Sequence, residues 1–513
     1  MTTQSTVYLY IIGLLILCGS ALQVSAQPVV SGHNLALGGG GTAYLNGLEA
    51  NFYNPANLII FDRKGRFHFG TGNAGGYFQP VLSTDNISTQ ITGFRDIFRP
   101  HSLGSQSVSV SERNEILEQH YPGKTLTSRH QARAEVILAG IQWRGDRQAY
   151  SLVARTRIGT RTEVGRGWYS DEFIKRENRR VRDFQLTMQS LILHELSFGY
   201  AQEFELINGL LPQINKFYIG IAPKVVVAGS YMDATYDARY ETDSDKMTGL
   251  MHRSRFTHHS SGLYSDMIRH YRSTGQLQQA LNQYPDEYHS LSPTGYGLGI
   301  DFGLTYLISL GSDVSILDRG ANRVPVKKSL RIAFSLTDLG IIHYNTAPFT
   351  ASGYQETALV EEQDPVQSKF IGAPGQFLSY FEEADALSNP LLSPAEHSED
   401  PFSGLLPTSF NAGALLDLHR LKLMGDFTLA LNKTAFSGTQ LTAHLGMEAR
   451  LLPFIPIRLG TQIAAGTPMA VGLGTGIETR YWSFAISSQV LLKASSLTSE
   501  MVGGAFAGLQ FHL

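Results

Sequence analysis

The sequence predicts an all-β fold: a transmembrane antiparallel β-barrel of about fourteen strands, with an N-terminal plug in its lumen and long extracellular loops. Three observations predict it. The chain begins with an export signal, and many later segments alternate between apolar and small or polar residues. After residue 26 there is no run of eighteen apolar residues that could form a transmembrane helix. The expected location is therefore the outer membrane of a Gram-negative cell.

Residues 1–26 are expected to be a signal peptide. An apolar run over residues 7–17 leads to Val24-Ser25-Ala26, an A-x-A-like cleavage site, although no Lys or Arg precedes the run. Cys18 allows a second interpretation, a lipidation site, but the bulky Leu17 stands before it. Because Cys18 is the only cysteine, cleavage after Ala26 would leave no disulfide to stabilise the fold.

Residues 27–65 are expected to form the plug, or hatch, of the barrel. Glycines adopt backbone angles that other residues rarely take, which suits tight packing in a lumen. The segment contains four in a row: Gly38, Gly39, Gly40 and Gly41. Asn54, Pro55 and Ala56 follow, where Pro55 fixes its own φ and Asn54 can close a turn through its side chain. Shaping a turn and gating or binding a ligand are both open roles for these three residues.

The clearest strand covers residues 294–306. One face is apolar and ends in tyrosines: Tyr296, Leu298, Ile300, Phe302, Leu304 and Tyr306. The other face is small or polar: Gly295, Gly297, Gly299, Asp301, Gly303 and Thr305. At ~3.3 Å per residue and a tilt of ~45°, such a strand spans about 23 Å, close to the apolar band of an outer-membrane barrel.

Strands of similar length recur, and the barrel is expected to occupy residues 66–513. The expected strands lie at 66–78, 134–144, 148–164, 190–206, 216–243, 294–310, 329–345, 408–418, 421–435, 441–451, 455–465, 469–479, 482–491 and 501–513. Alternate connections are mostly short: 145–147, 419–420, 453 and 480–481. The longest of the others are polar and are expected to be extracellular loops: about 79–133, 244–293 and 346–407.

The C-terminal residues suggest how such a barrel would be assembled. Gly508, Phe511 and Leu513 are spaced as in the assembly signal of outer-membrane barrels, although Leu513 stands where an aromatic residue is commoner. The expected partners are therefore the barrel assembly machinery, outer-membrane lipid and lipopolysaccharide. Arg253, Arg255, Arg269 and Arg272 could bind lipopolysaccharide phosphates, because a guanidinium binds phosphate in bidentate fashion.

The amino-terminal motif resembles a known family. Asn54-Pro55-Ala56 in a glycine-rich context before the first strand is similar to the plug of the FadL family of long-chain fatty-acid and hydrocarbon channels, and Leu406-Pro407 is similar to the start of a late strand of that family. The stretch Ser335-Leu336-Thr337-Asp338-Leu339-Gly340 and the Pro-rich acidic stretch before Leu406 resemble an uncharacterised domain-of-unknown-function subgroup related to the PorV-type barrels of protein secretion. The resemblance implies a plugged barrel and a passive uptake channel for hydrophobic small molecules.

Other kinds of chemistry find little support. The net charge is −3 with no basic stripe, which argues against a nucleic-acid partner. No G-x-S-x-G elbow occurs, the P-loop pattern fails at Glu118, and the glycines at Gly472, Gly474 and Gly476 lie within an alternating strand. Four histidines in one predicted loop lack metal-site spacing: His252, His258, His259 and His270. No enzyme activity, cofactor or metal is expected.

Two functions therefore remain as hypotheses. The first is the channel for hydrophobic small molecules. The alternative is a non-transporting barrel that acts as a docking or organising component in protein secretion or at the cell surface. Lumen polarity and loop shape would separate them, and neither can be read from one sequence.

Overall fold

The structure, a computed structural model, describes a large part of the chain. The described residues are 29–60, 66–79, 114, 117–118, 121, 127–168, 170, 172–176, 179–205, 215–243, 250–274, 292–310, 328–359, 396–437, 441–464, 469–492 and 499–513. The expected signal peptide and most of the expected loop 79–133 lie outside these ranges.

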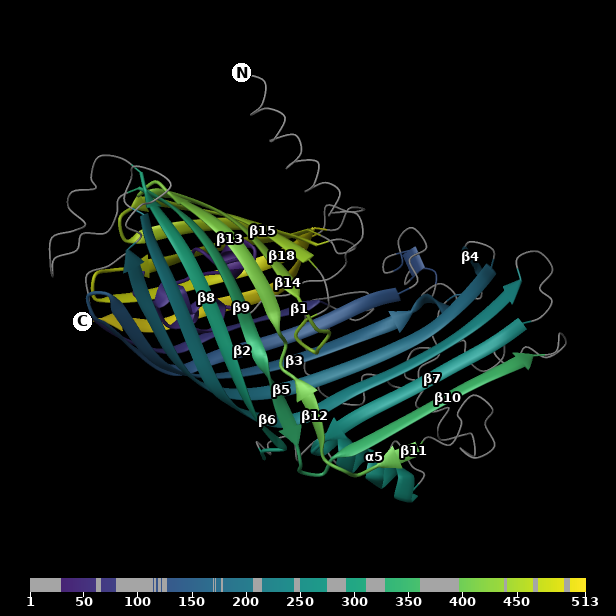
Figure 1. The fold of residues 1–513 in the computed structure, drawn as a ribbon. Coiled ribbons are helices and arrows are strands. Elements are labelled where there is room, and N and C mark those ends of the chain that lie inside the picture. Colours follow the sequence, from purple (N-terminus) through teal and green to yellow (C-terminus); the bar gives the residue numbers. More distant parts are fainter. Residues whose placement is uncertain are drawn as a thin grey trace.

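In the described residues, nineteen strands form one antiparallel sheet, and fourteen of them close into a barrel (Figure 1). The fourteen are β1 (Phe67–Gln79), β2 (Thr127–Arg144), β3 (Gln148–Gly165), β5 (Arg179–Glu205), β6 (Asn215–Asp243), β8 (Gly295–Ser309), β9 (Ser329–Tyr344), β13 (Ser409–Asp417), β14 (Leu421–Ala430), β15 (Leu441–Leu452), β16 (Ile455–Ala464), β17 (Met469–Glu478), β18 (Trp482–Leu492) and β19 (Ser499–His512). Closure comes from β1 pairing with β19, with Phe69 opposite Phe511. The predicted fold class is confirmed, and each predicted strand overlaps one of these fourteen.

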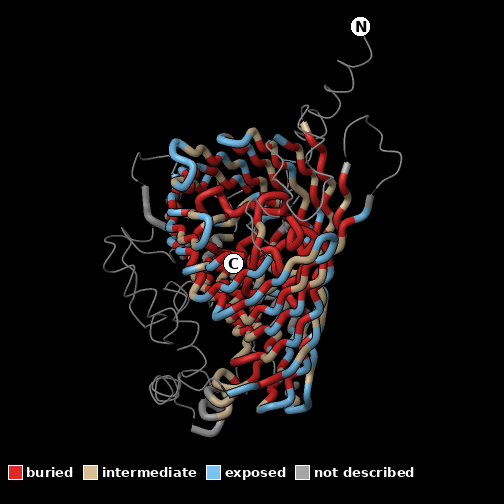
Figure 2. The backbone as a smooth tube through the Cα atoms, turned by 90° about the vertical axis from the view of Figure 1, so that its left-hand side faces the viewer, coloured by how far each residue is buried: buried red, intermediate tan, exposed pale blue. Residues whose placement is uncertain are grey.

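The barrel is polar inside and apolar outside. Its largest fully buried side chains include four arginines: Arg133, Arg155, Arg157 and Arg458. Large apolar side chains point outward instead, with Leu298 68% and Leu473 57% exposed. Buried and exposed positions alternate along the strands in Figure 2. Successive side chains of a strand point to opposite faces, so each strand contributes to both surfaces.

The two ends of the barrel differ. At the end that carries Leu513, called here the C-terminal end, most described connections are short, as between β2 and β3 or between β13 and β14. At the opposite end, called here the loop end, β5 and β6 run on past the barrel over residues 179–190 and 231–243. A register shift between Leu191 and Leu193 marks where this extension begins.

The segments expected to be loops 244–293 and 346–407 are partly strand and helix. They contain β7 (Leu250–Ser261), α5 (Leu263–Thr274), β10 (Phe349–Leu359), β11 (Glu396–Ser398) and β12 (Phe402–Leu405), while β4 (Ile174–Arg176) and η5 (Arg166–Trp168) lie between β3 and β5. β7 pairs with the extension of β6, and β10 pairs with β7. We call β7, β10 and residues 179–190 and 231–243 the ribbon; it projects beyond the barrel in Figure 1.

Residues 231–243 of the ribbon lie in the predicted strand 216–243, but β7, β10 and most of residues 179–190 were not predicted, because these segments do not alternate in polarity. In β7, His258 and His259 are neighbours on opposite faces, so neither face is apolar in the sequence. Pairing with β6 supplies the backbone hydrogen bonds that make the segment a strand. No helix among the described residues is long and apolar enough to cross a membrane.

Candidate functional site

Residues 29–60, called here the lumen segment, lie inside the barrel (Figure 1). They form η1 (Leu35–Leu37), α2 (Gly47–Tyr53) and η2 (Pro55–Ile59). Every residue is buried except His33 and Asn46, which are half-buried. η1 contacts β15 to β18 and η2 contacts β5, β6 and β8, so the segment touches well-separated parts of the wall.

Asn54, Pro55 and Ala56 anchor η2 to the wall. The Asn54 side chain accepts a hydrogen bond from the Ala56 backbone N–H (3.1 Å) and donates to the Thr42 carbonyl (2.9 Å) and Thr305 Oγ1 (3.0 Å). A Cβ at Gly220 or Gly303 would overlap Pro55 or Ala56, so the chain approaches the wall closely there. These contacts fit the turn-shaping role. A gating role stays a prediction.

The four glycines form the turn after η1. Gly38 and Gly39 have φ of 76° and 91°, in the left-handed region that favours glycine. A Cβ at Gly38 would overlap the Thr461 backbone, and one at Gly40 would lie 2.7 Å from Asp426 Oδ2. Gly41 faces the Leu45 side chain. The predicted tight packing of these glycines in the lumen is what the structure has.

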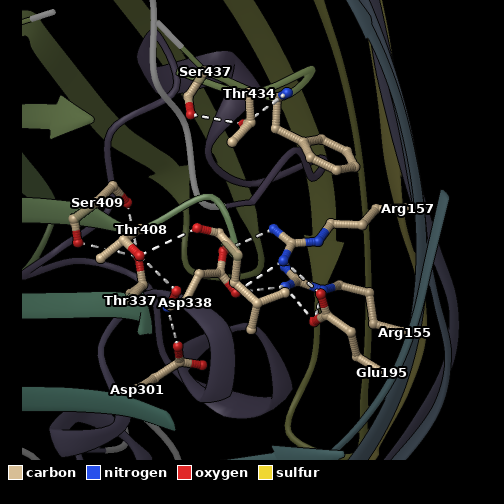
Figure 3. A network of polar contacts seen from close by, with 12 residues as sticks. Arg155, Arg157, Glu195, Asp301, Thr337, Asp338, Thr408, Ser409, Thr434 and Ser437 are labelled. Atoms are coloured by element: carbon tan, nitrogen blue, oxygen red, sulfur yellow. Dashed lines mark hydrogen bonds and ion pairs between the residues drawn. The ribbon is translucent and has the colours of Figure 1, made fainter. Parts of the chain in front are cut away.

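Above the lumen segment, toward the loop end, six buried charged residues form what we call the charge layer. Figure 3 labels all of them except Lys224. They come from five neighbouring strands: Arg155 and Arg157 (β3), Glu195 (β5), Lys224 (β6), Asp301 (β8) and Asp338 (β9). Arg157 binds both carboxylate oxygens of Asp338 at 2.8 Å. Three positive and three negative charges balance, as a dry interior requires.

The charge layer is densely connected. Arg155 donates to Glu195 at 2.6 Å, and Lys224 donates to Asp301 at 2.8 Å and to Asp338 at 2.5 Å. Asp338 has φ of 58°, unusual for a residue other than glycine, and its backbone N–H donates to Asp301. Asp338 is thus held on both its side chain and its backbone.

Two phenylalanines connect the charge layer to two neighbouring segments: α2 of the lumen segment and the β14–β15 connection. Phe52 of α2 lies under Arg155, with the guanidinium 3.9 Å from the ring centre. Phe436 comes from the β14–β15 connection, where residues 431–437 turn into the barrel, and lies near Arg157 (4.9 Å) and Arg133 (5.4 Å). Cation–π contacts of this kind strengthen when they are desolvated. The layer is therefore in contact with the lumen segment on one side and this inward turn on the other.

A second ion network lies near the C-terminal end. Arg458 binds Glu448 at 2.9 Å and also Glu478, and Tyr44 of the lumen segment donates to Glu448 at 2.5 Å. Beside it is a polar cavity of about 60 Å³. Its lining includes His33, Glu49, His68, Lys422, Arg450 and His512. Burial alone would raise the pKa of Glu49, but the His33 imidazole and hydrogen bonds from Asn73 and Ser31 hold it below the ordinary value.

The residues of the predicted assembly signal lie on the closing strand. A Cβ at Gly508 would overlap the backbone of Thr71 and Gly72. Phe511 is 42% exposed on the outer face, and Leu513 hydrogen-bonds with Phe67 through both its backbone N–H (2.8 Å) and its carbonyl (3.0 Å). The position suits a role in closing the barrel. Recognition by an assembly machinery stays a prediction.

The described histidine and arginine side chains of the expected loop 244–293 have different surroundings. His258 is buried and hydrogen-bonds to Ser260, whereas its neighbour His259 is exposed. Arg253 lies 3.7 Å from Glu241. In the described part of the chain, no three His, Cys, Asp or Glu side chains are grouped so that they could hold a metal ion.

Sequence reasoning placed Asp301 on a polar strand face but missed the charge layer. The sequence did contain a signal for buried charges. On one face of the predicted strand 148–164, every second residue from 155 to 163 is charged except Gly159: Arg155, Arg157, Arg161 and Glu163. Phe436 gave no comparable signal, because residues 421–435 were expected to form one strand. The strand ends at Ala430 and the chain turns inward.

The chain is similar to several solved structures of transporters and channels. The toluene transporter TodX of Pseudomonas putida is 10% identical with a TM-score of 0.41, over 93% of this chain and 97% of that one. The monoaromatic hydrocarbon channel CymD is 12% identical (TM-score 0.38; 94% and 97%). A FadL homologue of Pseudomonas aeruginosa is 10% identical (TM-score 0.36; 96% and 97%). No curated protein matches the sequence.

The predicted resemblance to FadL-type barrels is thus recovered among solved structures, and the predicted domain-of-unknown-function subgroup has a counterpart. The model of a family of unknown function, DUF5723, matches residues 71–488, well over half of the chain. The protein therefore belongs to the DUF5723 family.

Proposed function

We propose that the protein is a β-barrel of the Gram-negative outer membrane. The support is its inside-out surface: arginines are buried in the lumen, while leucines and phenylalanines are exposed around the wall. Trp143, Tyr150 and Tyr200 stack side by side near the short turns of the C-terminal end. Aromatic rings at that level suit a membrane interface, where one end of the ring is apolar and the other is wet.

We infer further that the barrel is a channel for a hydrophobic small molecule and is closed at rest by the lumen segment. The observation that carries this is an aromatic stack at the loop end. Tyr231 lies 4.5 Å from Tyr344, which lies 5.0 Å from Phe402, between ring centres. The stack adjoins a buried apolar cluster that includes Leu193, Val226 and Leu406. An apolar solute would find a favourable surface there.

Passage beyond the stack requires movement, because the charge layer and the lumen segment fill the barrel below it. The lumen segment forms no ladder with the described strands and is held largely by side-chain contacts such as that of Asn54 with Thr305. It can shift without breaking the sheet. We therefore propose a closed channel that opens transiently, and not a permanently open pore.

The docking function is the second candidate, and the ribbon favours it. Arg179 and Arg253 flank Glu241 on the ribbon, and Tyr354 of β10 is 54% exposed. A channel has no evident need for a sheet that projects this far, whereas a docking barrel would use it to bind another protein.

Saturable uptake of a labelled alkane or fatty acid into proteoliposomes tests the channel. We expect Phe402→Ala to lower uptake, because it breaks the aromatic stack, and the matched variant Tyr354→Ala on the ribbon to leave uptake unchanged. Intact protein that neither binds nor passes any apolar probe would end the channel proposal. Loss of a co-purifying partner in Tyr354→Ala, with no uptake by either form, would favour docking.

A further inference from the structure

Asp426 is an exception among the buried carboxylates. Twelve Asp and Glu residues of the described chain are buried. Eleven have a Lys, Arg or His nitrogen within 4.0 Å: Glu49, Glu135, Glu163, Asp183, Glu195, Glu203, Asp301, Asp338, Asp417, Glu448 and Glu478. Asp426, only 1% exposed, has none. An isolated buried carboxylate is costly unless a proton neutralises it or a cation balances its charge.

Unpartnered oxygens surround this carboxylate. Asp426 Oδ2 accepts a hydrogen bond from the Thr42 backbone N–H (3.3 Å), but Oδ1 has no partner. Three further buried oxygens make no hydrogen bond of good geometry: Asn411 Oδ1, Thr428 Oγ1 and Thr42 Oγ1. Both threonine hydroxyls lie near the Tyr53 hydroxyl, and that of Thr42 also lies near the Asp426 carboxylate. The amide nitrogen of Asn411 donates to Ser335, which leaves its oxygen as the free acceptor. Buried polar atoms without partners point to an unseen water or ion.

The register of the strands brings these oxygens together. Asn411 lies opposite Thr428, and Gly413 lies opposite Asp426, all facing the lumen on β13 and β14. A Cβ at Gly413 would overlap Asp426 Oδ1 and lie 3.1 Å from the Thr42 side chain. Gly413 thus leaves the carboxylate open toward the lumen segment, which brings Thr42 alongside it.

His444 lies opposite Asp426 but does not supply the missing charge. Its Nδ1 lies 2.6 Å from the Gly38 carbonyl, which can only accept, so Nδ1 carries a proton. Its Nε2 is buried without a partner, as expected of a neutral ring, and no ion pair joins it to Asp426. No side chain of the described residues therefore supplies a positive charge to Asp426.

We propose that Asp426 anchors a site for one hard monovalent cation, a sodium ion. One carboxylate balances one positive charge, and oxygen ligands suit hard cations and not soft ones. Asp426, Asn411, Thr428 and Thr42 are its ligands. Because Thr42 belongs to the lumen segment and the others to the wall, the ion fastens the segment to the barrel. The proposal is independent of what the barrel transports or docks.

The test uses the full-length protein in detergent, with its thermal unfolding midpoint measured in sodium, potassium and choline chloride at equal ionic strength. We expect the midpoint to be several degrees higher in sodium than in choline. Asp426→Asn, which keeps the shape and removes the charge, should abolish that difference. Asp417→Asn is the matched control, because Asp417 has its own cationic partners, and it should keep the difference.

Two further measurements do not depend on the variants of Asp426 and Asp417. Broadening of the sodium NMR signal by the wild type reports the ion directly, and labelling of Asn46→Cys in the lumen segment should slow in sodium. Equal midpoints in all three salts would overturn the proposal, and so would a midpoint that responds only to pH, which means that Asp426 holds a proton. A response to calcium or magnesium but not to sodium would overturn the monovalent assignment.

Discussion

Arg157 is the residue that connects most of the lumen: it binds Asp338 and Glu195 and lies near the ring of Phe436. Removal of one partner from a buried ion network leaves an uncompensated charge, which costs about 3–5 kcal/mol. We expect Arg157→Met to lower the free energy of unfolding by that amount. Denaturant titration in detergent micelles measures it.

The matched control is Arg66→Met, because Arg66 pairs with Asp146 at the surface, with side chains 59% and 73% exposed. Such pairs contribute below about 1 kcal/mol. If the two variants lose the same stability, the charge layer is not a structural centre.

His258 makes the ribbon sensitive to acid. Burial, and secondarily the neighbouring His259, lowers the pKa of His258 to about 4. The unfolded chain has the ordinary value of about 6.5, so it binds more protons than the folded ribbon between these values. The contribution of neutral His258 to the stability of the ribbon is therefore fully present above pH 6.5 and falls as the pH drops toward 4.

Hydrogen exchange of the β7 and β10 amides at pH 7.5 and pH 5 measures this effect. After correction for the intrinsic exchange rate at each pH, the protection of these amides should be lower at pH 5 in the wild type and change much less in His258→Gln. An equal loss of protection in both forms would assign the effect to other groups.

The sequence predicted on which face of a strand a residue lies, but not which residue it contacts. Alternation placed Asp301 on a polar face, and the structure agrees. Its partner Lys224 lies 77 positions earlier in the chain. Their meeting depends on the register of β6 against β8, which alternation alone does not determine.

The inward turn of residues 431–437 is an element that the sequence did not predict. Gly159 lacks a side chain where the ring of Phe436 lies, and a Cβ there would come 2.7 Å from the ring. We expect Gly159→Ala to push the turn out and to release Lys433, whose side chain is already 37% exposed, from its ion pair with Glu163 at 2.6 Å. Trypsin cleavage after Lys433 should become about tenfold faster, which corresponds to about 1.4 kcal/mol.

The double variant Gly159→Ala with Phe436→Ala is the control, because the smaller side chain leaves room for the new methyl group. Adding Gly159→Ala to Phe436→Ala should change the cleavage rate little. An equal effect in both backgrounds would mean that the two positions do not meet.

The closing strand β19 is the element on which barrel formation depends. Phe511 pairs with Phe69 on one side and Trp482 on the other. Deletion of residues 511–513 would leave these backbone groups without partners at the seam, which a membrane does not tolerate. We expect the truncated chain to lose its heat-modifiable gel mobility and its outer-membrane fractionation. Normal insertion would show that β19 does not need these residues.

Barrel strands were predictable because their outer face is apolar and their inner face lines a polar lumen. Strand β8 alternates from Tyr296 onward for this reason. In the ribbon, Arg253 and Arg255 alternate with other polar residues, so the pattern disappears. Its strands are specified by pairing with β6, a tertiary effect that a single sequence does not reveal.

In the whole molecule, the barrel wall and the lumen segment are held by different interactions. Each barrel strand bonds to two neighbours, and closure leaves no free edge in the wall. The lumen segment adds contacts such as Tyr44 with Glu448, but no ladder with the described strands. The barrel wall should therefore remain folded without the lumen segment.

Deletion of residues 33–57 tests this separation. The barrel should still insert and remain heat-modifiable, because its backbone hydrogen bonds are made between strands. Conductance in planar bilayers should rise from near zero to a steady open level, since a barrel of this strand number is wide enough to conduct when nothing fills it. Asn54→Ala, which loosens the segment without removing it, should give only brief openings. A deletion variant that inserts but stays closed would mean that other residues close the barrel. The inward turn that carries Phe436 is the segment that such a result would implicate.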